Sequence, residues 1–319
     1  MPAPTKSWIL AAFAAVYIIW GSTYLGILFA IQSIPPFLMA GTRFLLAGLI
    51  MLGIAATQGS LRSTWADWRT ALIIGACLLL GGNGGVTAAE QFIHSGLASL
   101  IVATVPIYIT LLAWLVGMTP RPRPIVWLGL AGGFLGVAIL LGPALRFPSD
   151  GGSHPAIGMS ILLFSSFIWS VGSLYSRRTK HVTSPFLGAA QQMVCGGLLL
   201  LLMGFLIGEP RRFDPSHVSM LSLGAFVYLV LIGALVGYTA YFYLLRHCDP
   251  AKVATYAYVN PIVAVALGAL FAGEALTLRM VLAAGLIIGS VALVITVQQR
   301  KPGAAEPIGA VIKSAECAR

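Results

Sequence analysis

Long apolar runs separated by short polar stretches follow one another along almost the whole chain. A helix that spans a bilayer needs about 20 mainly apolar residues, and runs of this length without period-2 alternation indicate helices. Ten spans are predicted: residues 7–29, 37–57, 70–92, 96–118, 125–141, 156–175, 185–207, 220–245, 251–271 and 278–297. The span over 125–141 is short, so we expect its ends to extend into the flanking loops.

The ten spans form two copies of one pattern. Six residues of the first copy recur 149 residues later: Trp20, Pro36, Phe37, Leu38, Ala40 and Gly48 recur as Trp169, Pro185, Phe186, Leu187, Ala189 and Gly197. Gly82 and Pro106 recur 155 residues later, as Gly237 and Pro261. The offset therefore changes once, between the second and the third span of each copy, as one loop insertion would produce. Because each copy holds five spans, the second copy crosses the membrane in the opposite direction.

The predicted fold is therefore an all-α polytopic membrane protein, with ten transmembrane helices arranged as two inverted five-helix repeats around a central cavity. Inverted repeats of this kind build secondary transporters, with the substrate site between the halves. The expected divisions are a cytoplasmic N-terminus (1–6), a first repeat (7–146), a second repeat (156–297) and a disordered cytoplasmic tail (298–319).

Composition and charge agree with a membrane protein. Mean hydropathy is +0.92, and 9% of the residues are charged, against about 25% in soluble proteins. The net charge of +10 does not indicate nucleic-acid binding, because the basic residues lie in short loops without a basic stripe. Loops on the N-terminal side carry 14 of the 19 Lys and Arg residues and the opposite loops carry 4, which predicts that both termini are cytoplasmic.

Glycine and proline interrupt several spans. The third span contains a run over residues 81–85, four glycines and Asn83, which is either a hinge lining a cavity or a site of close helix packing. Pro106 and Pro261 each remove one helical hydrogen bond and are expected to kink their helices at equivalent places. Thr104 and Asn260 lie beside these prolines and are candidates for a substrate-facing or gating role, with packing the alternative for Asn260.

Aromatic and charged residues inside the spans are the other candidates. Trp20, Trp169, Tyr238 and Tyr258 lie too deep for a surface belt, so two or three of them are expected to line a mostly apolar cavity, and Tyr24 in the first span is a further candidate. Such a cavity suits flat or amphipathic solutes, and aromatic faces also attract ammonium groups.

Arg43 lies two turns inside the second span, where a charge needs a partner. Glu90 is the nearest candidate by depth, so the two form either a structural ion pair or an anchor for a substrate carboxylate. Glu274 is expected to serve the start of the next helix, with Thr277 as its N-cap. No Asp, Glu or His lies near the middle of a span, so no proton relay or metal site is predicted.

Several of these residues occur in short motifs. They are Trp20-Gly21-Ser22-Thr23-Tyr24, Arg43-Phe44, Glu90 before Ala98 to Pro106, and Tyr258-Val259-Asn260-Pro261 followed by Gly273-Glu274. Over residues 7–297 the chain resembles the drug/metabolite transporter superfamily, and within it the EamA-type ten-helix permeases. The resemblance implies a cavity formed by spans one, three, four, six, eight and nine. It also implies that spans five and ten pack at the periphery through Gly129, Gly133, Gly285 and Gly289.

From this resemblance we expect a secondary transporter that exports amino acids or similar small amphipathic metabolites across a bacterial-type inner membrane by alternating access, without a cofactor. Gln192 stands where the second copy would match Arg43, and the lack of further buried cations argues against phosphorylated substrates. The alternatives are a drug or vitamin-like permease and an intramembrane enzyme, for which no HExxH, GxSxG or paired carboxylates are found. The lipid bilayer and one small-molecule substrate are the expected partners; the oligomeric state is left open, and a monomer is compatible with the sequence.

Overall fold

The computed structural model describes residues 6–57, 59, 61–146, 155–179, 185–248, 253 and 255–299. These residues form helices joined by short connections, and no strand occurs among them. The prediction of an all-helical membrane protein with ten spans is confirmed. Residues 1–5 and most of the predicted tail, from residue 300 on, lie outside the described residues.

The first copy contains five helical spans. They are α1 (Lys6–Ala30); α2 (Pro36–Thr57); α3 (Trp65–Gly75) with the π-helical segment η1 (Ala76–Gly84) and α4 (Gly85–Ala89); α5 (Ser95–Val102) with α6 (Val105–Leu115); and α7 (Pro124–Arg146). The span predicted over 125–141 is thus longer at its C-terminal end, as expected. The third span is not broken at its glycines, because η1 carries the helix through them with wider turns.

The second copy repeats this order. Its spans are α8 (Pro155–Arg178); α9 (Pro185–Leu206); α10 (Met220–Tyr228) with the π-helical segment η4 (Leu229–Val236) and α11 (Gly237–His247); α13 (Tyr256–Phe271); and α14 (Leu278–Gln299). Two short 3-10 turns, η2 (Glu209–Arg211) and η3 (Pro215–His217), lie between α9 and α10. Eight of the ten spans are long and apolar enough to cross a membrane, and the other two contain shorter apolar helices over Pro124–Leu140 and Val259–Phe271.

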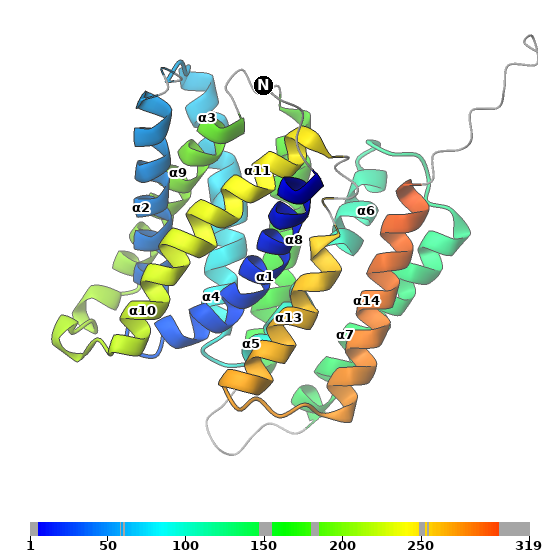
Figure 1. Cartoon of the computed structure of the whole chain (residues 1–319). Coiled ribbons are helices and arrows are strands. Elements are labelled where there is room, and N and C mark those ends of the chain that lie inside the picture. Colours follow the sequence, from blue (N-terminus) through cyan, green and yellow to red (C-terminus); the bar gives the residue numbers. More distant parts are fainter. Residues whose placement is uncertain are drawn as a thin grey trace, which may run out of the picture.

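Equivalent helices of the two copies pack against each other at the edges of the bundle. Figure 1 shows α2 beside α9 at one edge and α7 beside α14 at the other, and both pairs are in close contact. A β-carbon at Gly48 of α2 would lie 2.8 Å from the backbone nitrogen of Val194, and one at Gly197 of α9 would lie 2.6 Å from that of Leu45. The helix backbones approach this closely because equivalent positions in both helices are glycine.

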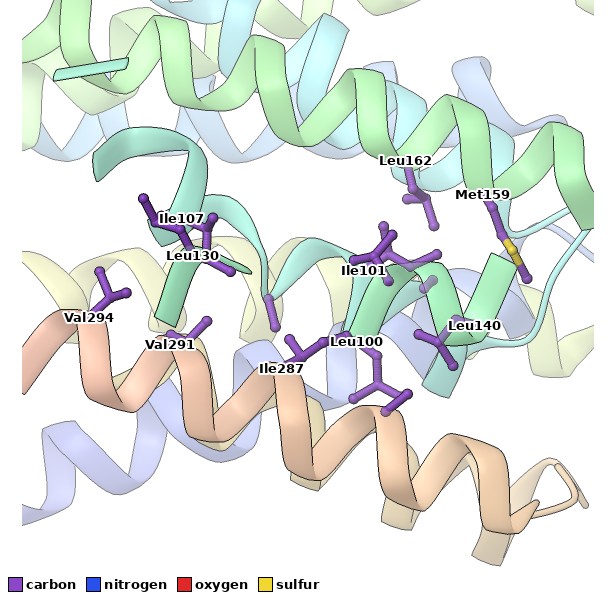
Figure 2. Packing of buried hydrophobic residues seen from close by; sticks show 14 of the residues in the cluster. Leu100, Ile101, Ile107, Leu130, Leu140, Met159, Leu162, Ile287, Val291 and Val294 are labelled. Atoms are coloured by element: carbon purple, nitrogen blue, oxygen red, sulfur yellow. The ribbon is translucent and has the colours of Figure 1, made fainter. Parts of the chain in front are cut away.

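The α7–α14 edge encloses the largest buried cluster of apolar side chains. Ile287, Val291 and Val294 of α14 face Leu130 of α7 and Ile107 of α6 (Figure 2). Gly129 packs against Val294, as the resemblance implied. The same expectation is wrong for the two glycines of the partner helix: a β-carbon at residue 285 or 289 would have no neighbour within 4 Å, because that face of α14 points away from α7.

Large apolar side chains also cover the outside of the bundle. Leu128 of α7, Leu202 of α9 and Leu282 of α14 are exposed over more than half of their surface, at 65%, 53% and 60%. A water-soluble monomer rarely shows apolar patches of this extent, whereas the hydrocarbon core of a bilayer solvates them. The surface therefore agrees with the sequence pattern in placing the helices in a membrane.

The two prolines do not kink their spans in the same way. The fourth span divides at Ala103 and Thr104, and Pro106 lies in the first turn of α6, where its missing N–H has no helical acceptor to lose. Pro261 instead lies inside α13, with a turn at Thr255 before the helix. The expected interruption is thus present one turn before Pro106, whereas α13 continues through Pro261, so the prediction of equivalent kinks in the two spans is wrong.

Candidate functional site

Two tryptophans join the copies through equivalent contacts. Trp20 of α1 packs on Gly237 at the start of α11, where a β-carbon would lie 2.6 Å from the indole Nε1. Trp169 of α8 packs on Gly82 of η1 in the same manner. Each ring of a first span thus rests on the third span of the other copy, at the end of or within a π-helical segment. The glycines are needed because any side chain there would collide with the ring.

A second pair of equivalent contacts brings the first and fourth spans together. The Ser170 hydroxyl of α8 donates to the carbonyl oxygen of Val105 at 3.4 Å. The matching residue in α1 is Gly21, and a β-carbon there would lie 3.1 Å from the carbonyl oxygen of Asn260. Helices α1 and α8 therefore occupy the middle of the bundle, each against spans of the opposite copy (Figure 1).

An aromatic cluster surrounds Trp20. Its ring centroid lies 5.3 Å from that of Tyr238, 5.0 Å from that of Tyr241 and 5.1 Å from that of Tyr256. The sequence pattern selected Trp20 and Tyr238 but not Tyr241 or Tyr256. Their positions in α11 and α13 become informative only once these helices are known to meet α1. The arrangement presents several ring faces and edges where the two copies meet.

Asn260 links α13 to α1. Its side-chain amide lies 3.2 Å from the carbonyl oxygens of Tyr17 and Tyr256, and because both neighbours are acceptors, the amide nitrogen is assigned to that side. The Tyr17 hydroxyl also shares a hydrogen bond of 2.5 Å with the Thr255 hydroxyl. The two amide bonds support packing between α13 and α1, the alternative that the sequence left open for Asn260, and Pro261 beside it is buried.

The other polar candidates differ in what they can offer a solute. The Thr104 hydroxyl is buried and donates to the carbonyl oxygen of Ile101 in its own helix at 2.6 Å. Asn83 is half-buried in η1, and its backbone carbonyl accepts from the Thr87 hydroxyl at 2.9 Å. Tyr258 is in α13, but its side chain lies outside the described part of the chain.

Arg43 is buried at 4% exposure and extends from α2 toward η4. Its Cζ atom lies 4.7 Å from the centroid of the Phe44 ring, and its Nη2 atom lies 3.3 Å from the place of a β-carbon on Gly233. The Nε atom is buried and has no hydrogen-bond partner among the described residues. The guanidinium therefore occupies a space that the missing side chain of Gly233 leaves open.

Glu90, at the C-terminal end of α4, is buried at 3% exposure, and neither carboxylate oxygen has a hydrogen-bond partner among the described residues. The predicted Arg43–Glu90 ion pair is not formed, since no described Arg or Lys nitrogen comes within 4.0 Å of this carboxylate. The guanidinium is directed to Gly233 instead. The two charges still lie within electrostatic range of each other, and Tyr24 and Glu274 lie within range of Glu90.

Two other buried carboxylates, unlike that of Glu90, accept hydrogen bonds from the protein. Glu274 accepts from the backbone nitrogen of Ser95 at 2.8 Å, from its hydroxyl at 2.6 Å and from the nitrogen of Gly96 at 2.9 Å. Glu209 accepts from the backbone nitrogens of Phe37 at 3.1 Å and Leu38 at 2.7 Å. Both carboxylates thus cap first turns of helices of the first copy, where exposed N–H groups favour negative charge.

The two capping carboxylates differ from what the sequence predicted: Glu274 caps another helix than expected, and Glu209 was not among the candidate residues. Thr277 is the N-cap of α14, as predicted, and accepts from the backbone nitrogen of Met280 at 3.2 Å. Glu274 does not join it there; it reaches across to α5, a contact between distant segments that the sequence does not reveal. Glu209 escaped the sequence analysis because it follows a span and resembles an ordinary loop residue.

Ten apolar spans in two similar sets, with aromatic and charged side chains buried where the sets meet, define a polytopic helical membrane protein of duplicated construction. The chain belongs to the EamA-like transporter family, whose model matches it twice, over residues 6–142 and 156–296. It is a membrane transporter. Among the described residues, no group of three or more His, Cys, Asp or Glu side chains could hold a metal ion.

Relatives match nearly the whole length. The inner membrane transporter YedA of Escherichia coli strain K12 is 38% identical over 291 residues, covering 90% of each chain. The transporter YvbV of Bacillus subtilis is 28% identical over 94% of this chain and 95% of its own. A Salmonella typhimurium protein named a probable amino-acid metabolite efflux pump is 24% identical, over 82% of this chain and 86% of its own.

The fold also has a counterpart among solved structures. One crystal structure superimposes on 93% of this chain and all of its own, with a TM-score of 0.63 and 20% sequence identity. At that identity the likeness concerns the path of the helices alone.

Proposed function

We propose that this protein is a secondary transporter that moves amino acids or similar small amphipathic metabolites across a bacterial-type inner membrane by alternating access, in the direction of efflux. The observation that carries the proposal is the aromatic cluster of Trp20, Tyr238, Tyr241 and Tyr256, which joins α1 of one copy to α11 and α13 of the other. A solute bound there would contact both copies, so binding could follow their relative motion.

Amphipathic solutes suit the chemistry of this cluster. Ring faces bind apolar side chains, and they attract ammonium groups through the ring quadrupole. The name of the Salmonella relative supports amino-acid metabolites and export, and the charge of the loops supports cytoplasmic termini.

Counterflow in proteoliposomes, with labelled amino acids tested one at a time and no ion gradient, is the direct test of substrate class. We expect saturable uptake of at least one amino acid. Trp20→Ala removes the centre of the cluster and should reduce the flux about tenfold or more, since a buried aromatic contact is worth on the order of one to several kcal/mol.

Trp8→Ala is the matched control, because Trp8 also lies in α1 but is 69% exposed on the outside of the bundle. Its flux should equal that of the wild type. Absence of exchange with every amino acid would overturn the proposed substrate class and direct the search to drugs or vitamin-like metabolites. Equal flux in Trp20→Ala and wild type would overturn the assignment of the site.

Direction requires intact cells. Cells that produce the protein and are fed a dipeptide should release the constituent amino acid faster than cells that produce Trp20→Ala. Faster uptake of external amino acid without faster release would contradict efflux.

A further inference from the structure

Two buried groups of opposite charge, Arg43 and Glu90, lie in the same part of the bundle without an ion-pair partner among the described residues. Arg43 is 4% exposed and Glu90 is 3% exposed. The Nε atom of Arg43 and both carboxylate oxygens of Glu90 have no hydrogen-bond partner among the described residues. Burial of unpaired charge is costly, so such groups are normally retained where another molecule or another state of the protein supplies the partner.

Other buried carboxylates of this protein do have hydrogen-bond partners, so the lack of partners is particular to Glu90. Glu209 and Glu274, which are buried to a similar degree, accept two and three hydrogen bonds from helix starts. Glu90 lies at the other end of a helix, at the C-cap of α4, where the backbone offers carbonyl oxygens rather than N–H groups. A carboxylate there needs a donor from outside the helix.

The space beside Arg43 is shaped by α1 and η4. A β-carbon on Gly233 would lie 3.2 Å from Cγ2 of Thr23 and 3.3 Å from Nη2 of Arg43, so Thr23 and the tip of the guanidinium both lie against the side of η4 where Gly233 has no side chain. Tyr24, the next residue of α1, is within electrostatic range of Glu90. The same turn of α1 therefore adjoins both charges.

The geometry points to a binding site for a zwitterion, in which the Arg43 guanidinium binds the carboxylate of a free amino acid and Glu90 accepts hydrogen bonds from its ammonium group. This inference rests on the proposed function and names the groups that recognise the substrate. Arginine presents a planar fork of donors that matches a carboxylate, and an ammonium group carries three donors suited to carboxylate oxygens.

Charge balance makes the inferred site selective. With an amino acid bound, each of the two protein charges is paired with an opposite charge. An amine leaves Arg43 unpaired, and a carboxylic acid leaves Glu90 unpaired, so each incurs the cost that the amino acid removes. The second copy has no such site, because Gln192 and Leu245 stand at the positions equivalent to Arg43 and Glu90.

The test compares three competitors of the labelled amino acid that the counterflow assay identifies: L-phenylalanine, 2-phenylethylamine, which lacks the carboxylate, and 3-phenylpropanoate, which lacks the ammonium group. Wild type should bind phenylalanine about tenfold or more tightly than either analogue, the effect expected for one unpaired buried charge. The readout is the inhibition constant of each compound.

Each of the two neutralising substitutions should abolish one of the two preferences and leave the other in place. Arg43→Gln should lose the preference for phenylalanine over the amine and keep its discrimination against the acid. Glu90→Gln should lose the preference over the acid and keep its discrimination against the amine. Arg43→Lys, which keeps the positive charge, should restore part of the wild-type order.

Two matched controls separate recognition from folding. Arg279→Gln removes an exposed arginine and should leave all three constants unchanged. Glu209→Gln disturbs a buried carboxylate that already has its partners, so it should lower thermal stability without altering the order of the competitors. If Arg43→Gln yields no folded protein, Glu90→Gln and Arg43→Lys still decide, because each makes its own prediction about the order.

Equal competition by the three compounds against wild type, or parallel losses in both neutralised variants, would overturn the zwitterion site. Wild-type exchange of amino acids together with such a result would leave the proposed function standing. Absence of exchange with every amino acid would overturn both.

Discussion

Gly233 determines where the side chain of Arg43 can lie. A methyl group at this position would come within 3.3 Å of Nη2 and 3.2 Å of Cγ2 of Thr23, closer than unstrained contacts. Gly233→Ala should therefore displace the guanidinium and raise the KM for the transported amino acid about tenfold, by weakening one charged hydrogen bond. KM and kcat from initial-rate counterflow measure the effect.

Gly224→Ala is the control for this substitution, since Gly224 lies in α10 of the same span and a β-carbon there would have no neighbour within 4 Å. Gly224→Ala should leave KM and kcat at their wild-type values. A wild-type KM in Gly233→Ala would show that Arg43 does not depend on this space.

Asn260 gives a prediction in which stability and transport separate. Its amide is the donor to two buried carbonyl groups, those of Tyr17 and Tyr256, which would lose their partner in Asn260→Ala. We expect a loss of about 1–3 kcal/mol in the free energy of unfolding, visible as a lower Tm in detergent. Asn260→Asp keeps the shape but cannot donate when ionised, so its Tm should fall as well.

An unchanged Tm together with lost transport would contradict the packing role and return Asn260 to the substrate. The sequence alone could not decide between these roles. It marks Asn260 as a polar residue beside a proline in a span, but it does not show that the carbonyl oxygens of α1 lie within 3.2 Å.

For Arg43 and Glu90 the sequence gives the depth of each residue in the membrane, but not the direction of its side chain. Counting from the ends of spans placed them at similar depth, and they do lie within electrostatic range. The direction of each side chain depends on its neighbours, and Gly233, which decides the matter for Arg43, is 190 positions away. An ion pair inferred from depth was therefore wrong although both residues are buried.

Among the elements, the two capping carboxylates hold helices of different copies together. Glu274 accepts three hydrogen bonds from the start of α5, and Glu209 accepts two from the start of α2. Glu274→Gln replaces one acceptor oxygen by a donor and leaves an N–H group unpaired, so it should cost about 1–3 kcal/mol of stability. Glu209→Gln should cost a similar amount, measured by thermal unfolding.

The two losses should add in the double variant, because the caps serve separate helices and share no partner. A double variant no less stable than either single one would show that the caps act as one unit. Stability above wild type in either single variant would contradict the capping role.

Helix boundaries were largely predictable, and their internal geometry was not. Apolar length alone located all ten spans to within a few residues, because the bilayer demands it. The glycines of residues 81–85 signalled a weak helix, yet weakness permits a hinge, a break or a π-helical segment alike. The structure has the last, and η4 is a π-helical segment in the corresponding span although glycine is sparse there.

For the whole molecule, the uneven distribution of Lys and Arg predicts which face meets the cytoplasm. In a background with the native cysteines replaced, His217→Cys should react with an impermeant maleimide applied to intact cells, since His217 is exposed beyond the second copy's α9. Leu61→Cys, exposed on the N-terminal side, should react only after the membrane is permeabilised. The opposite pattern would invert the topology.

The duplicated pattern by itself does not predict the pairing of α2 with α9 or of α7 with α14, and only the family resemblance led us to expect the second pair. Matching residues at fixed offsets show that two copies exist, while the contacts between copies depend on how they are placed. Trp20 on Gly237 and Trp169 on Gly82 are equivalent contacts, but a comparison of the two copies gives the tryptophans and the glycines as two unrelated matches. Only the fold shows that each tryptophan packs on the matching glycine of the other copy.

The connection between α9 and α10 is longer than the connection between α2 and α3. This difference shifts the offset between the copies from 149 to 155 residues, and the longer connection carries Glu209. Its carboxylate caps the start of α2 at one face of the protein. The shorter connection of the first unit contacts α9 through one hydroxyl, that of Ser63, which accepts from the Gln191 amide at 2.6 Å. A duplicated protein whose two connections differ in this way is not symmetric between its two faces, although both of its bundles follow one plan.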